Sequence, residues 1–218
     1  YVAHDAVDRF ENIELNKTKP GQDIPDIYYA VYQNIIAISL FNHEAHLFSH
    51  IYGGDHNLTE IEVLLQAKNN SHFNFEKVGE KSSNLSDEQF INFVKKGKEH
   101  CFRGDVFQLV LSRCFSQGFK GDEFNVYRTL RSINPSPYLF FFDYGYFKIF
   151  GSSPEAQLII QSGKAEIHPI AGTFRRTGDD EKDAVAAELL AKDPKENSEH
   201  VMLVDLARND LSRNGSQV

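Results

Sequence analysis

Positions with helical spacing and positions with strand spacing follow one another irregularly along the chain. Helical spacing is clearest after two capping boxes, Asn57 with Glu60 and Ser86 with Gln89, and after Asp193, which precedes a proline in the first helical position. These signals and the apolar spacing between them predict helices at 57–68, 86–104, 122–133, 179–192 and 193–209.

Runs of β-branched and aromatic residues between the helices predict strands. Single strands are expected at 28–40, 45–52 and 106–115. Two hairpins are expected, one joining 138–142 to 146–150 and one joining 156–161 to 164–170. Residues 69–85 are polar and aperiodic, which indicates a surface loop. Because there is no regular strand–helix–strand rhythm, we predict an α+β fold with antiparallel β-sheets and packed helices.

The charge balance and the cysteine content narrow the range of functions. The 218 residues include 23 basic and 31 acidic ones, and the resulting formal net charge of −8 argues against a nucleic-acid partner. The sequence has no run of about 18 apolar residues, so we expect no membrane span. Cys101 and Cys114 are expected to be reduced thiols in a cytoplasmic protein. The chain begins at Tyr1 rather than Met, which indicates a fragment or a processed product.

Glu199 stands out on the last predicted helix because its neighbours on that face are apolar. Helical spacing groups it with Met202, Leu203 and Leu206. A carboxylate among apolar side chains is costly to bury unless it is paired or bound to a metal. The alternative is a partly exposed carboxylate near the helix start that interacts favourably with the helix macrodipole.

Two turns carry further candidates. Gly172 permits close approach of the backbone to a ligand, and Thr173 offers a hydroxyl and an amide that could bind a carboxylate. The alternative for this pair is an ordinary loop after a strand. Glu155 follows a Ser-Pro turn between two strands and could act as a general acid. The alternative for Glu155 is a carboxylate that points to water.

Gln108 lies in the predicted strand 106–115. One face of that strand carries Phe107, Leu109 and Leu111, which are typical of a core. Gln108 belongs to the opposite face and projects toward a more polar space, such as a cavity. The alternative is a solvated sheet face.

Five ordered segments of the chain resemble one enzyme family. They are 105–110 (DVFQLV), 131–138 (RSINPSPY), 151–155 (GSSPE), 169–173 (PIAGT) and 198–211 (SEHVMLVDLARNDL). Together they resemble the chorismate-utilising enzymes, most closely the large subunits (component I) of anthranilate synthases. The resemblance is strong over 86–218 and weaker over 1–85. It implies that residues 1–218 are a fragment of a single chorismate-binding catalytic domain.

The resemblance assigns roles to individual residues. Glu199 corresponds to one of two glutamates that hold Mg²⁺, the implied cofactor. Glu155 corresponds to the general acid that protonates the departing ring hydroxyl. The substrate-binding positions that the resemblance implies are Ala171, Gly172, Thr173, Met202 and Leu203.

Two positions separate the members of the family. Aminodeoxychorismate synthases carry a lysine at the position of Ala171, and isochorismate and salicylate synthases carry a lysine base at the position of Gln108. A neutral amide cannot deprotonate water but can admit ammonia as the nucleophile. The resemblance therefore implies amination of chorismate and elimination of pyruvate to give anthranilate, in tryptophan biosynthesis. The alternatives are an aminodeoxychorismate synthase component I, in folate biosynthesis, and a non-catalytic partner-binding module.

The resemblance also implies partners and regulation. A glutaminase subunit (component II) would supply the ammonia. A tryptophan feedback site would use Asn134, Pro135, Ser136, Pro137 and Tyr138. The family's N-terminal feedback segment and its C-terminal catalytic part, with the second Mg²⁺ glutamate and the catalytic histidine, have no counterpart in residues 1–218. We therefore expect no chorismate turnover by this chain alone, and we expect self-association through exposed apolar surface.

Overall fold

Two units make up the chain in the computed structural model, Tyr1–His72 and Phe73–Val218. The structure describes residues 1–15, 24–53, 58–68 and 73–218. The strands of the described residues pair antiparallel, two by two, and the helices alternate irregularly with the strands along the chain. This mixture of helices and small antiparallel sheets confirms the predicted α+β class. The prediction of one domain over residues 1–218 stays a prediction.

The first unit contains a hairpin between two helical segments. Its elements are η1 (His4–Arg9, a 3-10 helix), β1 (Asn34–Ser39), β2 (Glu44–Ser49) and α1 (Leu58–Gln66). Ile36 on β1 lies opposite Leu47 on β2, in an antiparallel register. Both strands are shorter than predicted, but their pairing and the helix that follows are confirmed. The predicted helix cap Asn57 lies outside the described residues.

The second unit begins with a strand pair that the sequence did not predict. β3 (Phe75–Ser83) pairs antiparallel with β4 (Phe115–Gly121), and Ser83 lies opposite Phe115. The predicted loop is therefore wrong over 75–83, and the predicted strand is wrong over 106–114, which joins no sheet of the described residues. Most side chains of β3 are exposed, so it lacks the apolar alternation that marks a strand in the sequence.

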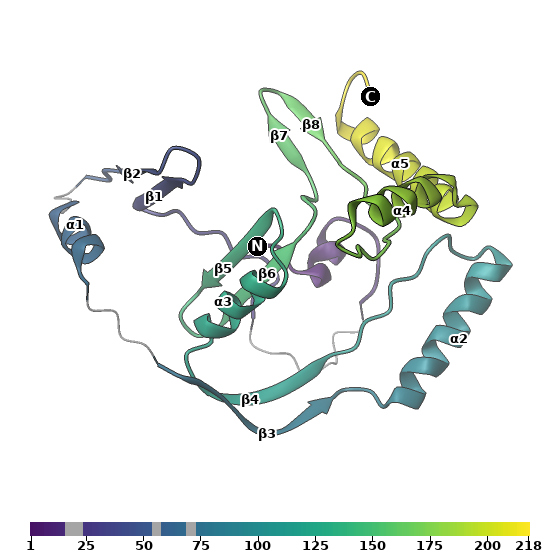
Figure 1. Cartoon of the computed structure of the whole chain (residues 1–218), viewed down its shortest axis with the longest axis horizontal. Helices are drawn as coiled ribbons and strands as arrows, with labels where there is room; N and C mark the ends of the chain where they lie inside the picture. The colour runs from purple at the N-terminus through teal and green to yellow at the C-terminus, as the bar shows by residue number, and fades with distance from the viewer. Residues whose placement is uncertain (16–23, 54–57, 69–72) are drawn as a thin grey trace. The chain divides into compact units, whose positions relative to one another are not determined.

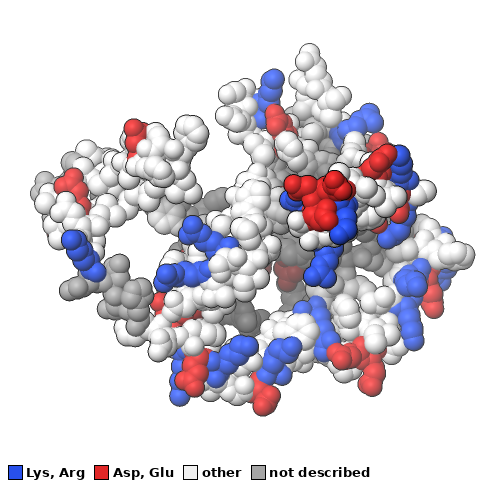
Figure 2. Space-filling model, in the orientation of Figure 1, with Lys and Arg blue, Asp and Glu red and all other residues white. Residues whose placement is uncertain are grey.

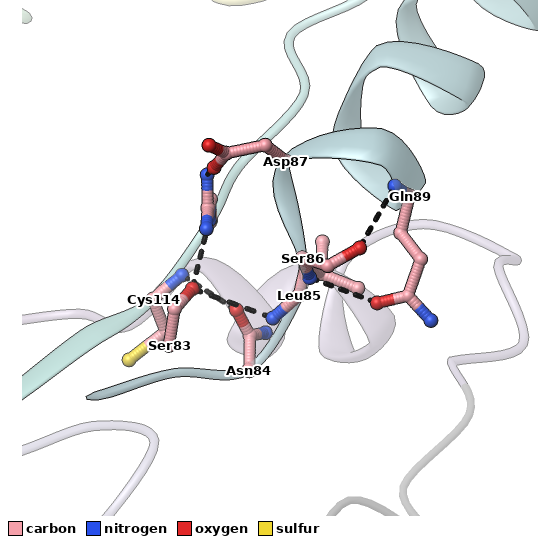
Figure 3. A network of polar contacts seen from close by, with 8 residues as sticks. Ser83, Asn84, Leu85, Ser86, Asp87, Gln89 and Cys114 are labelled. Carbon is pink, nitrogen blue, oxygen red and sulfur yellow. Dashed lines mark hydrogen bonds and ion pairs between the residues drawn. The ribbon is translucent and has the colours of Figure 1, made fainter.

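The helix α2 (Asp87–Arg103) begins at the predicted capping box (Figure 3). Ser86 Oγ accepts a hydrogen bond from the backbone N–H of Gln89 at 3.2 Å, and Gln89 Oε1 accepts one from the backbone N–H of Ser86 at 2.8 Å. Beside the cap, Arg113 Nε donates to Ser83 Oγ at 2.8 Å. Arg113 Nη1 also donates to Asp87 Oδ1 at 2.5 Å, so Arg113 connects the start of α2 to β3 and to the segment that precedes β4.

A helix lies against a hairpin in the second unit (Figure 1), and aromatic side chains hold the two together. The elements are α3 (Phe124–Ile133), β5 (Tyr138–Asp143) and β6 (Lys148–Ser153). The Phe124 ring meets Phe141 edge to face at 4.9 Å between centroids, and Phe141 stacks on Phe150 at 5.5 Å. The predicted helix and hairpin are both confirmed here.

The remaining elements are a short hairpin and two helices. They are β7 (Ile159–Gln161), β8 (Lys164–Glu166), α4 (Asp180–Lys192) and α5 (Pro194–Asn214). The hairpin is shorter than predicted, and α5 is longer. Asp193 ends α4 and begins α5, where its side chain accepts hydrogen bonds from the backbone N–H groups of Lys195 and Glu196. The two helices lie side by side around this corner (Figure 1).

Little of the apolar surface is buried within the chain. Among the described residues only Ala6 and Gly97 are buried. The accessible surface is 18938 Å², whereas two separate compact domains of these sizes would expose roughly 12,000 Å². Charged side chains of both signs are interspersed on the face that Figure 2 shows. No helix of the described residues is both long and apolar enough to cross a membrane. Self-association stays a prediction.

Candidate active site

A cavity of about 510 Å³ in the second unit brings together several of the residues that the sequence singled out. Four predicted site residues line it: Gln108, Glu155, Glu199 and Leu203. The other lining residues are Ser153, Gln157, Ile167, Pro169, Ile170, Leu206, Ala207 and Asp210. The walls therefore come from the segment before β4, from the residues on either side of the β7–β8 hairpin, and from one face of α5.

The wall that α5 contributes carries both carboxylates and apolar side chains. Glu199, Leu203, Leu206 and Asp210 recur at helical spacing, so two carboxylates bracket two leucines on one face. Glu199 is half-buried, which agrees with the alternative of a partly exposed carboxylate near the helix start rather than with full burial. Met202 is also half-buried but does not line the cavity. The cavity can thus offer carboxylate oxygens beside an apolar surface.

Glu155 lies just after β6, at the border between this cavity and a smaller one. Its backbone is fixed by Ser153, whose hydroxyl donates to the Glu155 carbonyl at 2.9 Å and accepts from the Glu155 N–H at 3.3 Å. The Glu155 side chain is exposed. The Glu155 carboxylate can therefore reach a molecule bound in the cavity while it is still in contact with water.

The smaller cavity, of about 210 Å³, contains part of the predicted feedback site. It is lined by Pro137, Tyr138, Pro154, Glu155, Ala156, Ile159, His168 and Ile170. Asn134, Pro135 and Ser136 do not line it, and the Asn134 carbonyl instead accepts a hydrogen bond from Ser152 Oγ at 2.5 Å. Two of the five predicted feedback residues therefore share a wall with Glu155.

Gln108 reaches the cavity from the segment that was predicted to be a strand. Leu109 and Leu111 turn the other way: their Cδ1 atoms lie 3.5 and 3.8 Å from the position of a Cβ on Gly97 of α2. Gln108 therefore lies on the opposite side of the segment from the apolar contact with α2, as the sequence predicted. Phe107, which was expected to join that core face, is 94% exposed. The Phe107 side chain therefore lies outside the contact that Leu109 and Leu111 make with α2.

The Ala171–Thr173 turn lies outside the cavity lining, against the α4–α5 corner. Gly172 has a φ of 72°, and a Cβ at this position would lie 2.6 Å from Glu196 Oε2 and 3.1 Å from Leu190 Cδ1. Only glycine satisfies both the left-handed backbone and the close contact. Ala171 is half-buried and Thr173 is exposed.

Glu196 is a residue that the sequence reasoning missed. Its side chain is 19% exposed, and it lies one helical turn before Glu199 on α5. The spacing of three residues between the two glutamates was visible in the sequence and placed both carboxylates on one side of the predicted helix. The contact with Gly172 was not visible, because it depends on how the turn folds back onto α5.

The family relationship follows from the whole sequence. Residues 1–218 match the family described as chorismate binding enzyme. The chain belongs to this family. The match extends over both units, including residues 1–85, where the sequence motifs were weakest.

Individual relatives refine this relationship. The chain is 49% identical to anthranilate synthase component 1 of Aquifex aeolicus over 131 residues, which cover 60% of this chain and 26% of that protein. It is 36% identical to anthranilate synthase component 1 of Methanothermobacter thermautotrophicus over 215 residues, covering 98% and 44% of the two chains. The crystal structure of anthranilate synthase component I from Streptococcus pneumoniae matches with a TM-score of 0.81 at 28% identity, covering 98% and 49%.

These matches show both what the chain is related to and how much of its relatives' length it covers. The chain is a homologue of anthranilate synthase component I. It spans about half the length of the relatives that it matches along its whole length. The activity, substrate and partners of a whole synthase therefore come to this chain only as proposals.

The family implies a Mg²⁺ site, which requires oxygen ligands. Glu199 supplies a carboxylate, the kind of ligand that Mg²⁺ prefers. The described residues contain no group of three or more histidine, cysteine, aspartate or glutamate side chains that could hold a metal ion. The donor set of the described residues thus fits Mg²⁺ in chemistry but not in number.

Proposed function

We propose that this chain forms one side of the chorismate site of an anthranilate synthase large subunit. The reaction would aminate chorismate and eliminate pyruvate to give anthranilate. The observation that carries this proposal is the single cavity lined by Gln108, Glu155 and Glu199, in a homologue of anthranilate synthase component I.

Glu155 is proposed as the general acid that gives a proton to the ring hydroxyl as it departs. Its position at the mouth of the cavity and its anchored backbone support this role. Gln108, a neutral amide on the same cavity, would leave ammonia as the nucleophile because it cannot deprotonate water. Ala171 supports the same outcome, since alanine offers no amine to attack the ring.

Glu199 is proposed to contribute one carboxylate to a Mg²⁺ ion, and bound Mg²⁺ would neutralise the ring carboxylate of chorismate. Gly172 and Thr173 would bind a substrate carboxylate through backbone N–H and hydroxyl groups. Leu203 would contact the ring from the α5 wall, and Met202 is proposed to support it from the next position on the helix. Since the described residues do not complete a metal site, we expect no chorismate turnover by the 218-residue chain alone.

The proposal extends to the partner, the regulation and the location. A glutaminase, component II, would supply ammonia. Tryptophan would bind near Asn134–Tyr138, and the support is the cavity that Pro137 and Tyr138 share with Glu155. A cytoplasmic location is supported by the free, exposed thiols of Cys101 and Cys114.

A chimera tests the reaction. The chain would replace the matched 215 residues of the Methanothermobacter thermautotrophicus protein, and the product formed from chorismate, ammonia and Mg²⁺ would be separated and identified. We expect anthranilate, and we expect Glu155→Gln and Glu199→Gln each to lower kcat/KM at least about 100-fold. Glu188→Gln, which removes an exposed carboxylate of α4, is the matched control and should leave the rate unchanged.

Other products would separate the alternatives. Aminodeoxychorismate instead of anthranilate would identify an aminodeoxychorismate synthase and contradict the assignment of Ala171. A folded chimera that makes neither product, beside an active parent enzyme, would favour a non-catalytic partner-binding module.

A further inference from the structure

The segment that follows Gly172 is attached to the first turn of α4 through one carboxylate. Asp183 Oδ1 accepts hydrogen bonds from the Thr177 backbone N–H at 2.7 Å and from Thr177 Oγ1 at 2.8 Å. Asp183 Oδ2 accepts one from Arg176 Nε at 3.2 Å. The Asp183 side chain is only 11% exposed although it lies on a surface helix. The bonds from Thr177 hold the pKa of this carboxyl below its ordinary value.

The Thr177 hydroxyl continues this network into the cap of α4. It accepts a hydrogen bond from the Asp179 N–H at 3.3 Å. The Asp179 side chain in turn accepts from the backbone N–H groups of Glu181 and Lys182 at 3.1 and 3.2 Å. The end of the loop and the start of the helix are therefore one hydrogen-bonded unit, so the loop cannot move there without disturbing the helix cap.

The other end of the segment is held by packing. Gly172 lies against the Glu196 carboxylate and the Leu190 side chain, on α5 and α4. Thr173, Phe174 and Arg175 lie between the two anchors and are exposed. Only these three residues separate the packed end of the loop from the hydrogen-bonded end. The position of Thr173 therefore depends on both anchors.

We propose that Asp183 is a positioning residue that fixes the Gly172–Thr173 turn by anchoring Thr177 and Arg176 to α4. The inference rests on the proposed function in one respect: the turn is taken to bind a carboxylate of chorismate. Asp183 itself touches no substrate in this proposal. Its effect reaches the site through the short exposed stretch that ends at Thr177.

Limited proteolysis of the 218-residue chain tests the anchor without any ligand. Chymotrypsin would cut after Phe174, which is 40% exposed, and after Tyr146, a reference site that is 67% exposed in the β5–β6 turn. We expect Asp183→Asn and Thr177→Val to raise the cleavage rate after Phe174 about tenfold, the change that corresponds to losing one hydrogen bond to a charged group. Cleavage after Tyr146 should not change.

Two further variants separate the anchor from general effects. Thr177→Ser keeps the hydroxyl and should restore slow cleavage after Phe174. Asp180→Asn removes an equal charge from the same turn of α4, where the side chain is exposed, and should behave like the wild type. Unchanged cleavage in Asp183→Asn, or an equal rise after Tyr146, would overturn the proposal.

Binding of chorismate to the chimera described above, in the presence of Mg²⁺ and measured by titration calorimetry, tests the link to the site. We expect Asp183→Asn and Thr177→Val to raise Kd about tenfold and Thr177→Ser to restore it. Faster cleavage after Phe174 with an unchanged Kd would overturn the positioning role. An unsubstituted chimera that binds no chorismate would instead contradict the proposed function, and the cleavage rates would still decide whether Asp183 anchors the loop.

Discussion

Glu123, the residue that precedes α3, forms an ion pair with Lys148 at the start of β6. The hydrogen bond from Lys148 holds the pKa of Glu123 below its ordinary value of 4.5, and the same bond raises the pKa of Lys148 above 10.5. Lys148 also lies 3.4 Å from Asp143 on β5. The pair therefore connects α3 to the hairpin on the polar side of the aromatic contact between Phe124 and Phe141.

Replacement of Glu123 by glutamine should reduce the acid dependence of stability. A carboxylate with a lowered pKa stabilises the fold above its unfolded value of about 4.5, and that stabilisation is lost as the pH falls through the lowered pKa. The raised pKa of Lys148 has the opposite consequence, a loss as the pH rises through a value above 10.5. We expect Glu123→Gln to lower Tm by about 2 °C at pH 7 and by less at pH 3.

Differential scanning calorimetry at both pH values measures this effect. Glu188→Gln breaks an exposed pair with Lys192 within α4 and should change Tm by less than about 1 °C. An identical Tm loss for Glu123→Gln at pH 3 and pH 7 would mean that the pair does not cause the pH dependence.

Alanine at Gly172 should cost more stability than alanine at a glycine with the same backbone. Gly163 has a φ of 76° and nothing within 4 Å of the place that an added methyl group would take, whereas at Gly172 the methyl would meet Glu196. We expect Gly163→Ala to lower the free energy of unfolding by about 1 kcal/mol through backbone strain alone. Gly172→Ala should lower it by about 1–2 kcal/mol, because the added methyl must also displace the end of the flexible Glu196 side chain. Urea unfolding of both variants gives the comparison, and equal losses would contradict the close contact.

Alanine at Ser86 should destabilise α2 by about 1 kcal/mol. The substitution removes the hydroxyl that accepts from the Gln89 N–H, and caps of this kind contribute about that much. Ser132→Ala is the matched control, since its hydroxyl only donates to the Thr129 carbonyl within α3, and it should cost less than about 0.5 kcal/mol. Thermal unfolding followed by circular dichroism measures both, and a cap variant as stable as the control would refute the assignment.

Glutamine at Glu199 should uncouple chorismate binding from Mg²⁺. If Glu199 supplies a metal ligand, Glu199→Gln should abolish the tightening of chorismate binding by Mg²⁺ while leaving Tm within about 1 °C, because the side chain is only half-buried. Asp205→Asn, on the same helix and paired with Arg208, should keep the Mg²⁺ effect. Calorimetric titrations of the chimera with and without Mg²⁺ would reveal a persistent effect in Glu199→Gln, which would exclude Glu199 as a ligand.

The parts of the fold that the sequence predicted are the ones with local causes. Ser86 with Gln89 and Asp193 with its proline act within one helical turn, so their signals are complete in the sequence. The pairing of Ser83 with Phe115 joins segments that are distant along the chain, and β3 is mostly exposed, so its residues carry no apolar pattern. The apolar run 106–114 has strand composition but pairs with no strand of the described residues.

The residues of the candidate site also divide into those that the sequence could group and those that only the folded chain brings together. Glu199 and Leu203 could be grouped because helical spacing fixes their common face, and Gln108 because strand alternation opposes it to Leu109. The nearness of Gln108, Glu155 and Glu199 came only from the family resemblance and from the folded chain, since three separate segments supply them. Glu196 and Asp183 were missed because each acts on a turn whose path the sequence does not specify.

The corner at Asp193 fixes the rotation of α5 about its own axis. One residue ends α4 and caps α5. The connection therefore has no further residues that could adjust the rotation of the second helix. Each residue of a helix advances by about 100°. An insertion at this corner would rotate the whole stripe from Glu199 to Asp210 away from the cavity, whereas an insertion beyond Asn214 would leave it facing inward. The length of this junction is therefore as much a part of the candidate site as the carboxylates that line it.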